Sequence, residues 1–360
     1  MVSGNPLPKW KIAQPDYQWS FPKDHWSHPK YKTEWWYFTG QLQSQKKPHR
    51  RFGYQFTFFR IGILNQTESR KSLWATKNLI MGHAAISDLQ TKQHFFSEVL
   101  YREIPLLGKF GLYPNPVIAW SQGPAGTDQK WILSWNGEAF DFQVKDSRLG
   151  IGFELSTRPL KKLIFQGPNG YSLKGHIPSA SSQYYSFTRL ATKGELTLKN
   201  QIFLVEGESW MDKEFGSNQL AKNQIGWDWF SLQLNDGSEL MLYLLREHSG
   251  KIDFSRGTWI SKLGTTRYLK PGEWTLEVQS NWHSSKSKSF YPFGWIIHLP
   301  SENLKMEIVP ELADQENRSH LLQNLNYWEG AVSIQNQRGE KLGRGYVELT
   351  GYGKNNRPPI

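Results

Sequence analysis

The chain has 360 residues, which is more than one hydrophobic core usually organises, so we expect two domains. Its 17 tryptophans, with 31 glycines and 19 prolines spread along the chain, favour strands over helices, and no apolar run is long enough to span a membrane as a helix. The absence of cysteine excludes disulfides and cysteine-based metal sites, and the net charge of +11 is dispersed, which argues against a nucleic-acid partner.

The first predicted elements form a hairpin made largely of aromatic residues. Residues 34–42 (EWWYFTGQL) and 52–60 (FGYQFTFFR) are strand-like runs separated by a polar turn. Because side chains alternate along a strand, Trp35 and Tyr37 lie on one face and Trp36 lies on the other. Both faces are bulky, so we expect some rings to fill a barrel interior and others to line a cavity for an apolar ligand.

Short strand-like runs continue along the chain, as in residues 77–89 (KNLIMGHAAISDL) and 131–144 (WILSWNGEAFDFQV). We expect His83 to face the interior of the N-terminal domain, either as a buried histidine or as a ligand-binding residue. Residues 167–182 are rich in Gly, Pro and Ser, so we interpret them as a long loop or as a crossing between the domains. Tyr185 follows this loop and is a candidate hydrogen-bond donor to a ligand or to backbone.

The aromatic hairpin is repeated in the second half of the chain. Residues 226–234 (GWDWFSLQL) resemble 34–42, and the Asp-Gly pair that follows favours the tight turn of a second hairpin ending at Arg246. Asp228 stands where the first copy has Trp36. A carboxylate therefore replaces an indole between the two copies, which makes this position a candidate for chemistry.

The repeat and the strand-like runs that continue to the C-terminus predict an all-β fold. We expect two similar antiparallel β-barrels or sandwiches in tandem, packed together. The boundary is expected near residues 185–193, which gives one domain of residues 16–190 and a second of residues 191–352.

A series of motifs occurs in one order along the chain, namely HPKYKTEWWYFTGQLQ, RFGYQFTFFR, YYSFTRL, SWMDKEFGS, GWDWFSLQL, YWEGAV and GRGYVELTGY. Together they resemble the AttH-like family, also called the hydroxyneurosporene synthase or carotenoid 1,2-hydratase family. The resemblance covers about residues 17–352. It implies two tandem lipocalin-like (calycin) β-barrels packed into one rigid unit. It also implies a bacterial protein that is secreted or periplasmic, of the predicted secreted hydrolase type.

The resemblance implies two classes of function. Some family members hydrate an isolated alkene of a carotenoid or isoflavonoid, and others accompany ABC transporter components. In the hydratases the equivalent of WMDKEFG carries an aromatic-x-Asp-His-Asn pattern. Trp210 and Asp212 match this pattern, whereas Lys213 and Glu214 replace the His-Asn pair. The sequence therefore departs from the family's carotenoid hydratases at these two positions.

Three acids are candidates for catalysis, namely Asp212, Glu214 and Asp228. Hydration of an unactivated alkene needs a strong acid to protonate carbon and aromatic walls to stabilise the cation. A carboxyl stays protonated near neutral pH only where apolar surroundings or a second carboxylate raise its pKa. We expect the ligand to be bound by Glu34, Trp35, Arg60, His83, Tyr185, Trp210, Trp227, Trp229, Tyr243 and Arg246.

A structural role for the same acids is the alternative. Asp212 and Asp228 can tie strands together at a barrel end by pairing with one of the basic residues Arg60, Arg246 and Lys213. Glu34 can pair in the same way with Arg60. No metal ion is expected, because the spacing of the histidines is only a weak signal for a metal site. No cofactor is expected either, since the sequence has neither a phosphate-binding loop nor a Gly-x-Ser-x-Gly elbow.

Two functions from different classes follow from these observations. The first is a hydratase-like lyase or isomerase that acts on an unsaturated apolar molecule, with Asp212 as its acid and Asp228 or Glu214 as the partner of that acid. The second is a non-enzymatic carrier of a lipid or hydrophobic metabolite, working with an ABC transporter and in peripheral contact with a membrane surface. In both cases we expect the cavity at the domain interface, bounded mainly by the WMDKEFG and GWDWF segments, with Glu34, Trp35 and the 167–182 loop contributing from the N-terminal side.

Overall fold

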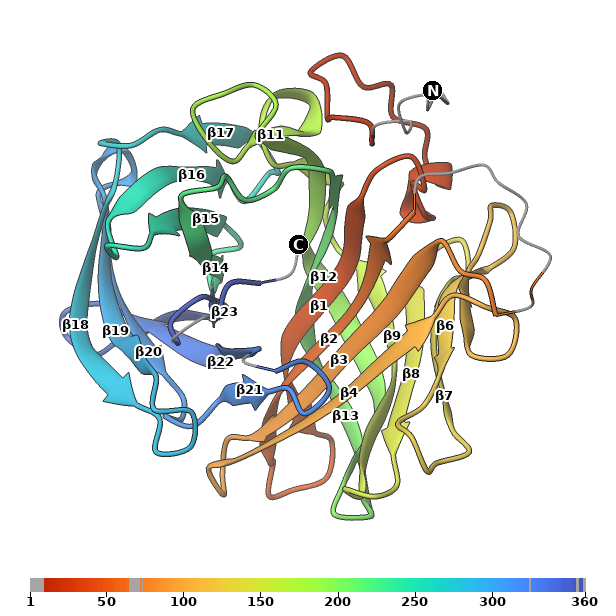
Figure 1. Cartoon of the computed structure of the whole chain (residues 1–360). Helices are drawn as coiled ribbons and strands as arrows, with labels where there is room; N and C mark the ends of the chain where they lie inside the picture. Colours follow the sequence, from red (N-terminus) through yellow and green to blue (C-terminus); the bar gives the residue numbers. More distant parts are fainter. Residues whose placement is uncertain (1–9, 65–71, 73, 324, 354–355, 359–360) are drawn as a thin grey trace, which may run out of the picture.

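A computed structural model describes residues 10–64, 72, 74–323, 325–353 and 356–358. Two antiparallel sheets make up the fold (Figure 1). The helical content of the described residues is confined to three short 3₁₀ turns, Lys23–His25, Pro168–Gly170 and Pro300–Glu302. The all-β prediction is confirmed. In this part of the chain no helix has the length and apolar character needed to cross a membrane.

The first sheet contains thirteen strands in the order β4-β3-β2-β1-β13-β12-β9-β8-β7-β6-β5, with β10 and β11 paired to β12. The strands are β1 (Thr33–Ser44), β2 (Arg51–Gly62), β3 (Asn78–Asp88), β4 (Gln93–Arg102), β5 (Gly108–Phe110), β6 (Val117–Gln122), β7 (Lys130–Trp135), β8 (Phe140–Asp146), β9 (Ile151–Pro159), β10 (Ile164–Phe165), β11 (Tyr171–Leu173), β12 (Ser181–Leu198) and β13 (Gln201–Gly216).

The second sheet contains ten strands in the order β17-β16-β15-β14-β23-β22-β20-β19-β18, with β21 paired to β22. The strands are β14 (Gln224–Leu234), β15 (Glu239–Glu247), β16 (Ile252–Ile260), β17 (Thr266–Leu269), β18 (Thr275–His283), β19 (Phe290–Leu299), β20 (Leu304–Pro310), β21 (Glu316–Arg318), β22 (Asn326–Gln335) and β23 (Lys341–Leu349).

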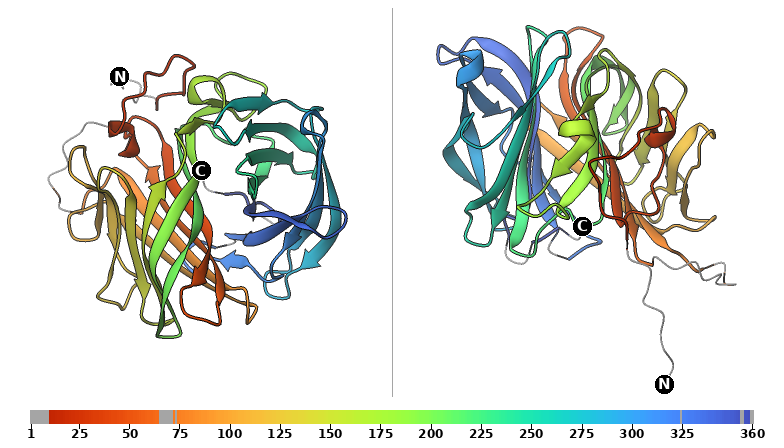
Figure 2. Two further views of the ribbon diagram at one scale, coloured as in Figure 1. Left: turned by 180° about the vertical axis from the view of Figure 1, so that it is seen from behind. Right: turned by 90° about the horizontal axis from the view of Figure 1, so that it is seen from above.

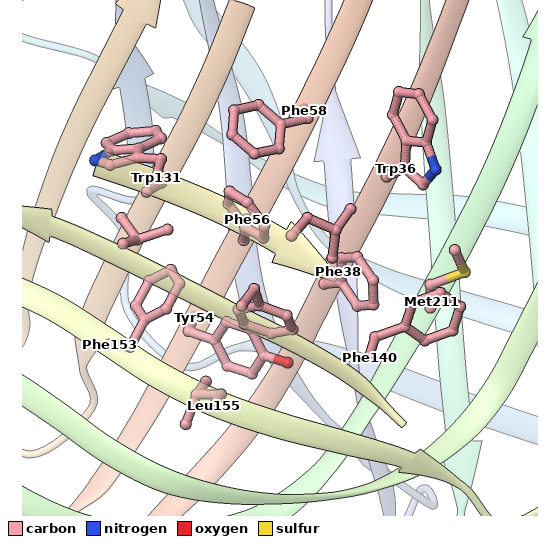
Figure 3. Packing of buried hydrophobic residues seen from close by; sticks show 14 of the residues in the cluster. Trp36, Phe38, Tyr54, Phe56, Phe58, Trp131, Phe140, Phe153, Leu155 and Met211 are labelled. Carbon is pink, nitrogen blue, oxygen red and sulfur yellow. The ribbon is translucent and has the colours of Figure 1, made fainter. Parts of the chain in front are cut away.

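Each sheet curls around its own hydrophobic cluster, and the two curled sheets lie side by side (Figures 1 and 2). One is a nearly closed barrel and the other a half-barrel, an arrangement of the lipocalin type. Figure 3 shows the first cluster, in which Trp36 and Phe38 of β1 pack among rings from β2, β7 and β8. The first barrel is therefore filled by side chains.

The chain passes from one sheet to the other later than predicted. The predicted boundary at 190/191 falls within β12, and the hairpin partner β13 still pairs with β1 and β12 of the first sheet. The first strand of the second sheet begins at Gln224. The long β12–β13 hairpin, whose strands run for 18 and 16 residues, explains the difference.

The predicted aromatic repeat forms two hairpins in corresponding places. β1 pairs with β2, with Glu34 opposite Arg60, and β14 pairs with β15, with Gly226 opposite Arg246. Each first strand is also paired on its other edge, β1 with β13 and β14 with β23. Both predicted hairpins are confirmed, and each occupies the middle of its sheet.

A third hydrophobic cluster lies between the sheets and joins them. It combines residues of the first sheet, such as Tyr37 and Trp210, with residues of the second sheet, such as Trp229. The rings of Tyr37 and Trp229 meet edge to face with centroids 5.1 Å apart. Gln41 of β1 also donates to the backbone carbonyl of Val332 at 2.8 Å. The outer faces of the two sheets are therefore packed against each other.

Candidate functional site

A pocket opens between the outer faces of the two sheets, next to the third cluster. It encloses about 70 Å³, while one water needs roughly 10–15 Å³ on the same measure. The pocket thus accommodates a compact ligand group rather than a long chain. Its lining residues are Trp35, Tyr37, Phe59, Lys174, Tyr184, Asp212, Glu214, Gln219, Trp227, Trp229, Tyr243, Leu245 and Glu348.

Strand alternation and register explain why the first sheet presents acids to this pocket. Trp35 lies opposite Glu214 across the β1–β13 ladder, and Tyr37 lies opposite Asp212. Residues opposite one another on neighbouring strands point to the same face of a sheet. Lys213, between the two acids, therefore points into the barrel while its neighbours point out.

Asp212 is a buried carboxyl held by three neutral donors. Its Oδ2 accepts from the Tyr184 hydroxyl at 2.6 Å, and its Oδ1 accepts from Trp210 Nε1 at 2.7 Å and from the Ser186 hydroxyl at 2.5 Å. Burial raises the pKa of Asp212 to about 7, although these hydrogen bonds act in the opposite direction. The charge of Glu214 nearby raises it further. At neutral pH this carboxyl is therefore divided between its acid and base forms.

Glu214 differs from Asp212 because it has a cationic partner. Lys174 Nζ lies 2.8 Å from Glu214 Oε1, and the Ser182 hydroxyl donates to the same oxygen. The Lys174 ammonium also lies over the rings of Tyr184 and Tyr243, 4.9 and 4.4 Å from their centroids. Glu214 is therefore bound to a cation, whereas Asp212 is bound to neutral donors.

The second sheet contributes indoles and a further acid. Trp229 lies opposite Tyr243 of β15 on one side and opposite Glu348 of β23 on the other. Trp227 Nε1 donates to Glu348 Oε2 at 2.7 Å. Burial raises the pKa of Glu348 to about 7, and Asp212 and Glu214 add to this effect. Two acids with raised pKa values thus enter one pocket from two sheets.

A family model described as AttH-like matches residues 12–352. The chain belongs to the AttH-like family. The resemblance drawn from the sequence motifs is thereby confirmed.

Known proteins are similar to this chain, two of them by structure and one by sequence. An AttH protein (NE1406) from Nitrosomonas europaea matches with a TM-score of 0.82 at 28% identity, over 95% of this chain and 99% of that chain. Kievitone hydratase from Nectria haematococca matches with a TM-score of 0.64 over 95% of both chains, and its identity of 13% makes this a likeness of fold. Dehydratase asqC from Emericella nidulans is 21% identical over 221 residues, which span 58% of this chain and 60% of that protein.

Six predicted residues of this AttH-like protein come together in the pocket. They are Asp212 and Glu214, predicted as acids, and the predicted ligand-binding residues Trp35, Trp227, Trp229 and Tyr243. Trp210 lies behind the pocket wall and donates to Asp212. The 167–182 loop contributes Lys174. The structure therefore has a pocket at the interface of the two sheets, where the cavity was expected.

Asp228 lies outside the pocket, which corrects the expectation that it joins Asp212. Its carboxylate accepts from Arg246 Nε at 2.9 Å and from the Tyr352 hydroxyl at 2.8 Å. Neighbouring residues of a strand point to opposite faces, so the tryptophans on either side of Asp228 face the pocket while Asp228 faces the second barrel. The structural alternative, in which this acid ties strands together through Arg246, is the arrangement observed.

Glu34 and Arg60 form part of a buried charge network inside the first barrel. Glu34 Oε2 accepts from Arg60 Nε at 2.9 Å and from the backbone N–H of His28 at 2.9 Å, and Oε1 pairs with Lys213 Nζ. The Lys213 ammonium lies 3.5 Å from the centroid of the Trp36 ring. Neither Glu34 nor Arg60 lines the pocket, because both point to the inner face of their strands.

His83 and Tyr185 also lie outside the pocket. The expectation that His83 faces the interior of the first barrel is wrong, since its Nδ1 lies 2.7 Å from the hydroxyl of Tyr327 on β22 of the second sheet. Tyr185 faces the barrel interior, with its hydroxyl 2.7 Å from His25 Nδ1. Burial lowers the pKa of both histidines to about 3, so both are neutral.

The most important residue that the sequence did not single out is Glu348. It lies within the GRGYVELTGY motif, but one glutamate in an alternating strand has the pattern of a solvent-facing residue. Lys174 was likewise expected only as part of a loop. Both residues enter the site through tertiary contacts with β13 and β14.

A second and larger hollow of about 740 Å³ shares no lining residue with the pocket. Its walls are largely polar, with Lys193 and Glu206 among them. Glu208 in this groove is paired with Arg189 at 2.7 Å and with Arg344 at 2.9 Å. We take the aromatic pocket as the candidate site, because it is the one that contains buried acids with raised pKa values.

Proposed function

We propose that this AttH-like protein is a hydratase-like carbon–oxygen lyase that acts on a compact, unsaturated, apolar molecule bound in the aromatic pocket. The observation that carries the proposal is Asp212, a buried carboxyl with three neutral donors and no cation among the groups that shift its pKa. A group with a pKa near 7 both gives and accepts protons at neutral pH.

The geometry supports the chemistry of hydration in the following way. Asp212 protonates one carbon of the alkene, and the π faces of Trp227 and Trp229 stabilise the cation that forms on the other carbon. Water then adds to this cation. Dehydration is the same sequence in reverse. The small volume of the pocket favours a compact substrate or the compact end of a larger one.

The relatives support the same reaction class. Kievitone hydratase and dehydratase asqC are named for the addition and the removal of water, respectively. The proposal itself depends on the buried acid and the aromatic walls of this chain.

Oxygen exchange from labelled water tests the proposal. Purified protein is incubated in H₂¹⁸O with a panel of compact apolar alkenes, and products are analysed by mass spectrometry. We expect ¹⁸O in the alcohol product, and a loss of about 10²–10⁴-fold in rate for Asp212→Asn. Glu208→Gln, in the separate polar groove, serves as the control and should keep the wild-type rate. Equal rates for wild type and Asp212→Asn would contradict the role of this acid.

A hydrophobic-ligand carrier is the second candidate, and the aromatic walls favour it. Trp35, Trp227 and Tyr243 surround the pocket whether or not its acids react. A carrier tolerates Asp212→Asn because shape and apolar area are retained. Native mass spectrometry of protein purified from its own host detects a retained lipid or metabolite, and the same ligand on wild type and Asp212→Asn, without conversion, supports the carrier.

We also propose that the protein works outside the cytoplasm, in the periplasm or as a secreted protein of a bacterium. The absence of cysteine suits an oxidising compartment, and the net charge of +11 suits contact with an anionic membrane surface. An ABC transporter component is the proposed partner if the protein is a carrier. Fractionation of the host, followed by immunoblotting of the periplasm, tests the location.

A further inference from the structure

Two glutamates stand side by side on the second sheet, and neither has a cationic partner within the part of the chain that the structure describes. Glu329 of β22 lies opposite Glu348 of β23 in the ladder, so both side chains leave the same face. Glu329 is 1% exposed, and its Oε1 accepts from the Tyr37 hydroxyl of the first sheet. Its Oε2 is buried without a hydrogen-bond partner. This pair therefore differs from buried glutamates such as Glu34 and Glu239, each of which is paired with at least two basic side chains.

The described groups that act on the pair are acidic or neutral. The first sheet contributes the hydroxyl of Tyr37 and the carboxyls of Asp212 and Glu214, while the second sheet contributes the indole of Trp227. The charge of Glu329 also contributes to the raised pKa values of the buried phenols Tyr327 and Tyr346. The cation of the pocket, Lys174, is engaged by Glu214 at 2.8 Å.

Two neighbouring carboxyls without a cation resist simultaneous ionisation. Burial raises the pKa of Glu329 well above its ordinary value, and the charge of Glu348 adds to this. Glu329 is therefore the neutral member at neutral pH. Glu348, which reaches the pocket and accepts from Trp227, is the member that exchanges its proton.

We propose that Glu348 is the second proton-transfer group of the pocket, working with Asp212 from the opposite sheet, and that Glu329 is a positioning residue that lets Glu348 carry the charge of the pair. The inference rests on the proposed hydration. Glu214 is held by Lys174 and Asp228 lies in the second barrel, so Glu348 is the remaining acid of the pocket.

The proton balance of the reaction assigns one step to each acid. The π electrons of the alkene take the proton of Asp212 and form a C–H bond. A water oxygen forms the C–O bond to the cation, and the oxonium loses its proton to the Glu348 carboxylate. Alkene and water give the alcohol, and transfer of a proton from Glu348 to Asp212 through water restores the starting state.

Carboxyl titration tests the pair without any substrate. ¹³C NMR of protein with labelled glutamate side chains follows each carboxyl between about pH 5 and pH 10. In wild type we expect one glutamate to titrate near neutral pH and a second at higher pH. Glu348→Gln removes the first transition and moves the second to lower pH, and Glu329→Gln removes the second. Glu316→Gln, a buried acid paired with Arg318 at 2.9 Å, should change neither.

The outcomes separate this inference from the proposed function. The proposed coupling would be contradicted if both glutamates titrate below about pH 5. It would also be contradicted if the titration of Glu329 occurs at the same pH in Glu348→Gln as in wild type. Kinetics on the alkene hydrated in the ¹⁸O experiment test its role: Glu348→Gln should lower kcat about 100-fold with little change in KM. A Glu348→Gln enzyme with wild-type kcat overturns the proton-transfer role even where the oxygen exchange itself occurs.

Glu329→Gln has a different expected signature, because this residue acts through Glu348. The amide keeps the contact with Tyr37 and the neutrality of the position, so we expect the pH profile of kcat to keep its position on the pH axis. Glu329→Lys introduces a cation beside Glu348 and should move the pH profile of kcat to lower pH. A profile that does not move would contradict the positioning role.

Discussion

Asp212→Asn is expected to stabilise the fold by up to about 4 kcal/mol at about pH 8, while it slows the proposed hydration about 10²–10⁴-fold. The pKa of Asp212 rises on folding from 3.8 to about 7. Between these two values the folded state binds more protons than the unfolded state, so native stability falls as pH rises through this window. Asparagine carries no charge and avoids this cost. Its amide can also accept from Trp210 and donate to Tyr184.

Urea unfolding at about pH 4, 6 and 8 measures this effect. The gain of Asp212→Asn over wild type should be near zero at about pH 4, grow with pH, and level off above about pH 7. Asp146→Asn is the matched control. Arg148 and Ser97 hold the pKa of Asp146 below its ordinary value against the effect of burial, so this substitution should lower the free energy of unfolding instead of raising it. A constant or negative effect of Asp212→Asn across this range would contradict the raised pKa. A gain in stability with a loss of activity is the usual signature of a functional site.

Glu34→Gln is expected to cost about 3–5 kcal/mol of stability at neutral pH. Burial alone would raise the pKa of Glu34, but Lys213, His28 and Arg60 together hold it below its ordinary value. The substitution keeps the shape of the side chain and leaves two buried cations without their carboxylate. An uncompensated buried charge costs far more than a lost surface ion pair.

Urea unfolding of Glu34→Gln at neutral pH tests this prediction, and two further variants give it a control. Lys213→Met in the Glu34→Gln background should recover part of the loss, because it removes one of the unpaired cations. Glu208→Gln breaks a partly exposed network with Arg189 and Arg344 and should cost about 1 kcal/mol or less. A loss below about 1 kcal/mol for Glu34→Gln would show that the buried network contributes little.

The sequence singled out two buried acids, Glu34 as a ligand-binding residue and Asp212 as a catalytic acid, and their contacts separate them. Glu34 has cations within reach and is fixed as a carboxylate, whereas Asp212 has neutral donors and exchanges its proton near neutral pH. Both side chains are carboxylic acids in strands, so composition and spacing cannot distinguish the ion-paired acid from the proton-exchanging acid. The distinction depends on which side chains of other strands lie beside each acid.

Much of the fold follows from local pattern. The alternation of large rings in 34–42, the Asp-Gly turn after 226–234 and the repeat between these segments were enough to predict an all-β fold with two equivalent hairpins. The domain boundary was harder to predict from the sequence, because the β12–β13 hairpin continues the same strand pattern past residue 190. Which sheet a strand joins depends on its pairing partners rather than on its own residues.

The sequence by itself determined which residues share a face: Trp35 with Tyr37, and Trp227 with Trp229, because the two-residue period of a strand is a property of the chain. The same period already separated Asp228 from these tryptophans. Only the tertiary structure decided that these two aromatic faces meet each other and enclose Asp212 together with Glu348. Strand pairing between β14 and β23 joins residues more than a hundred positions apart, and burial, which raises the pKa values of the acids, exists only after the two sheets have packed.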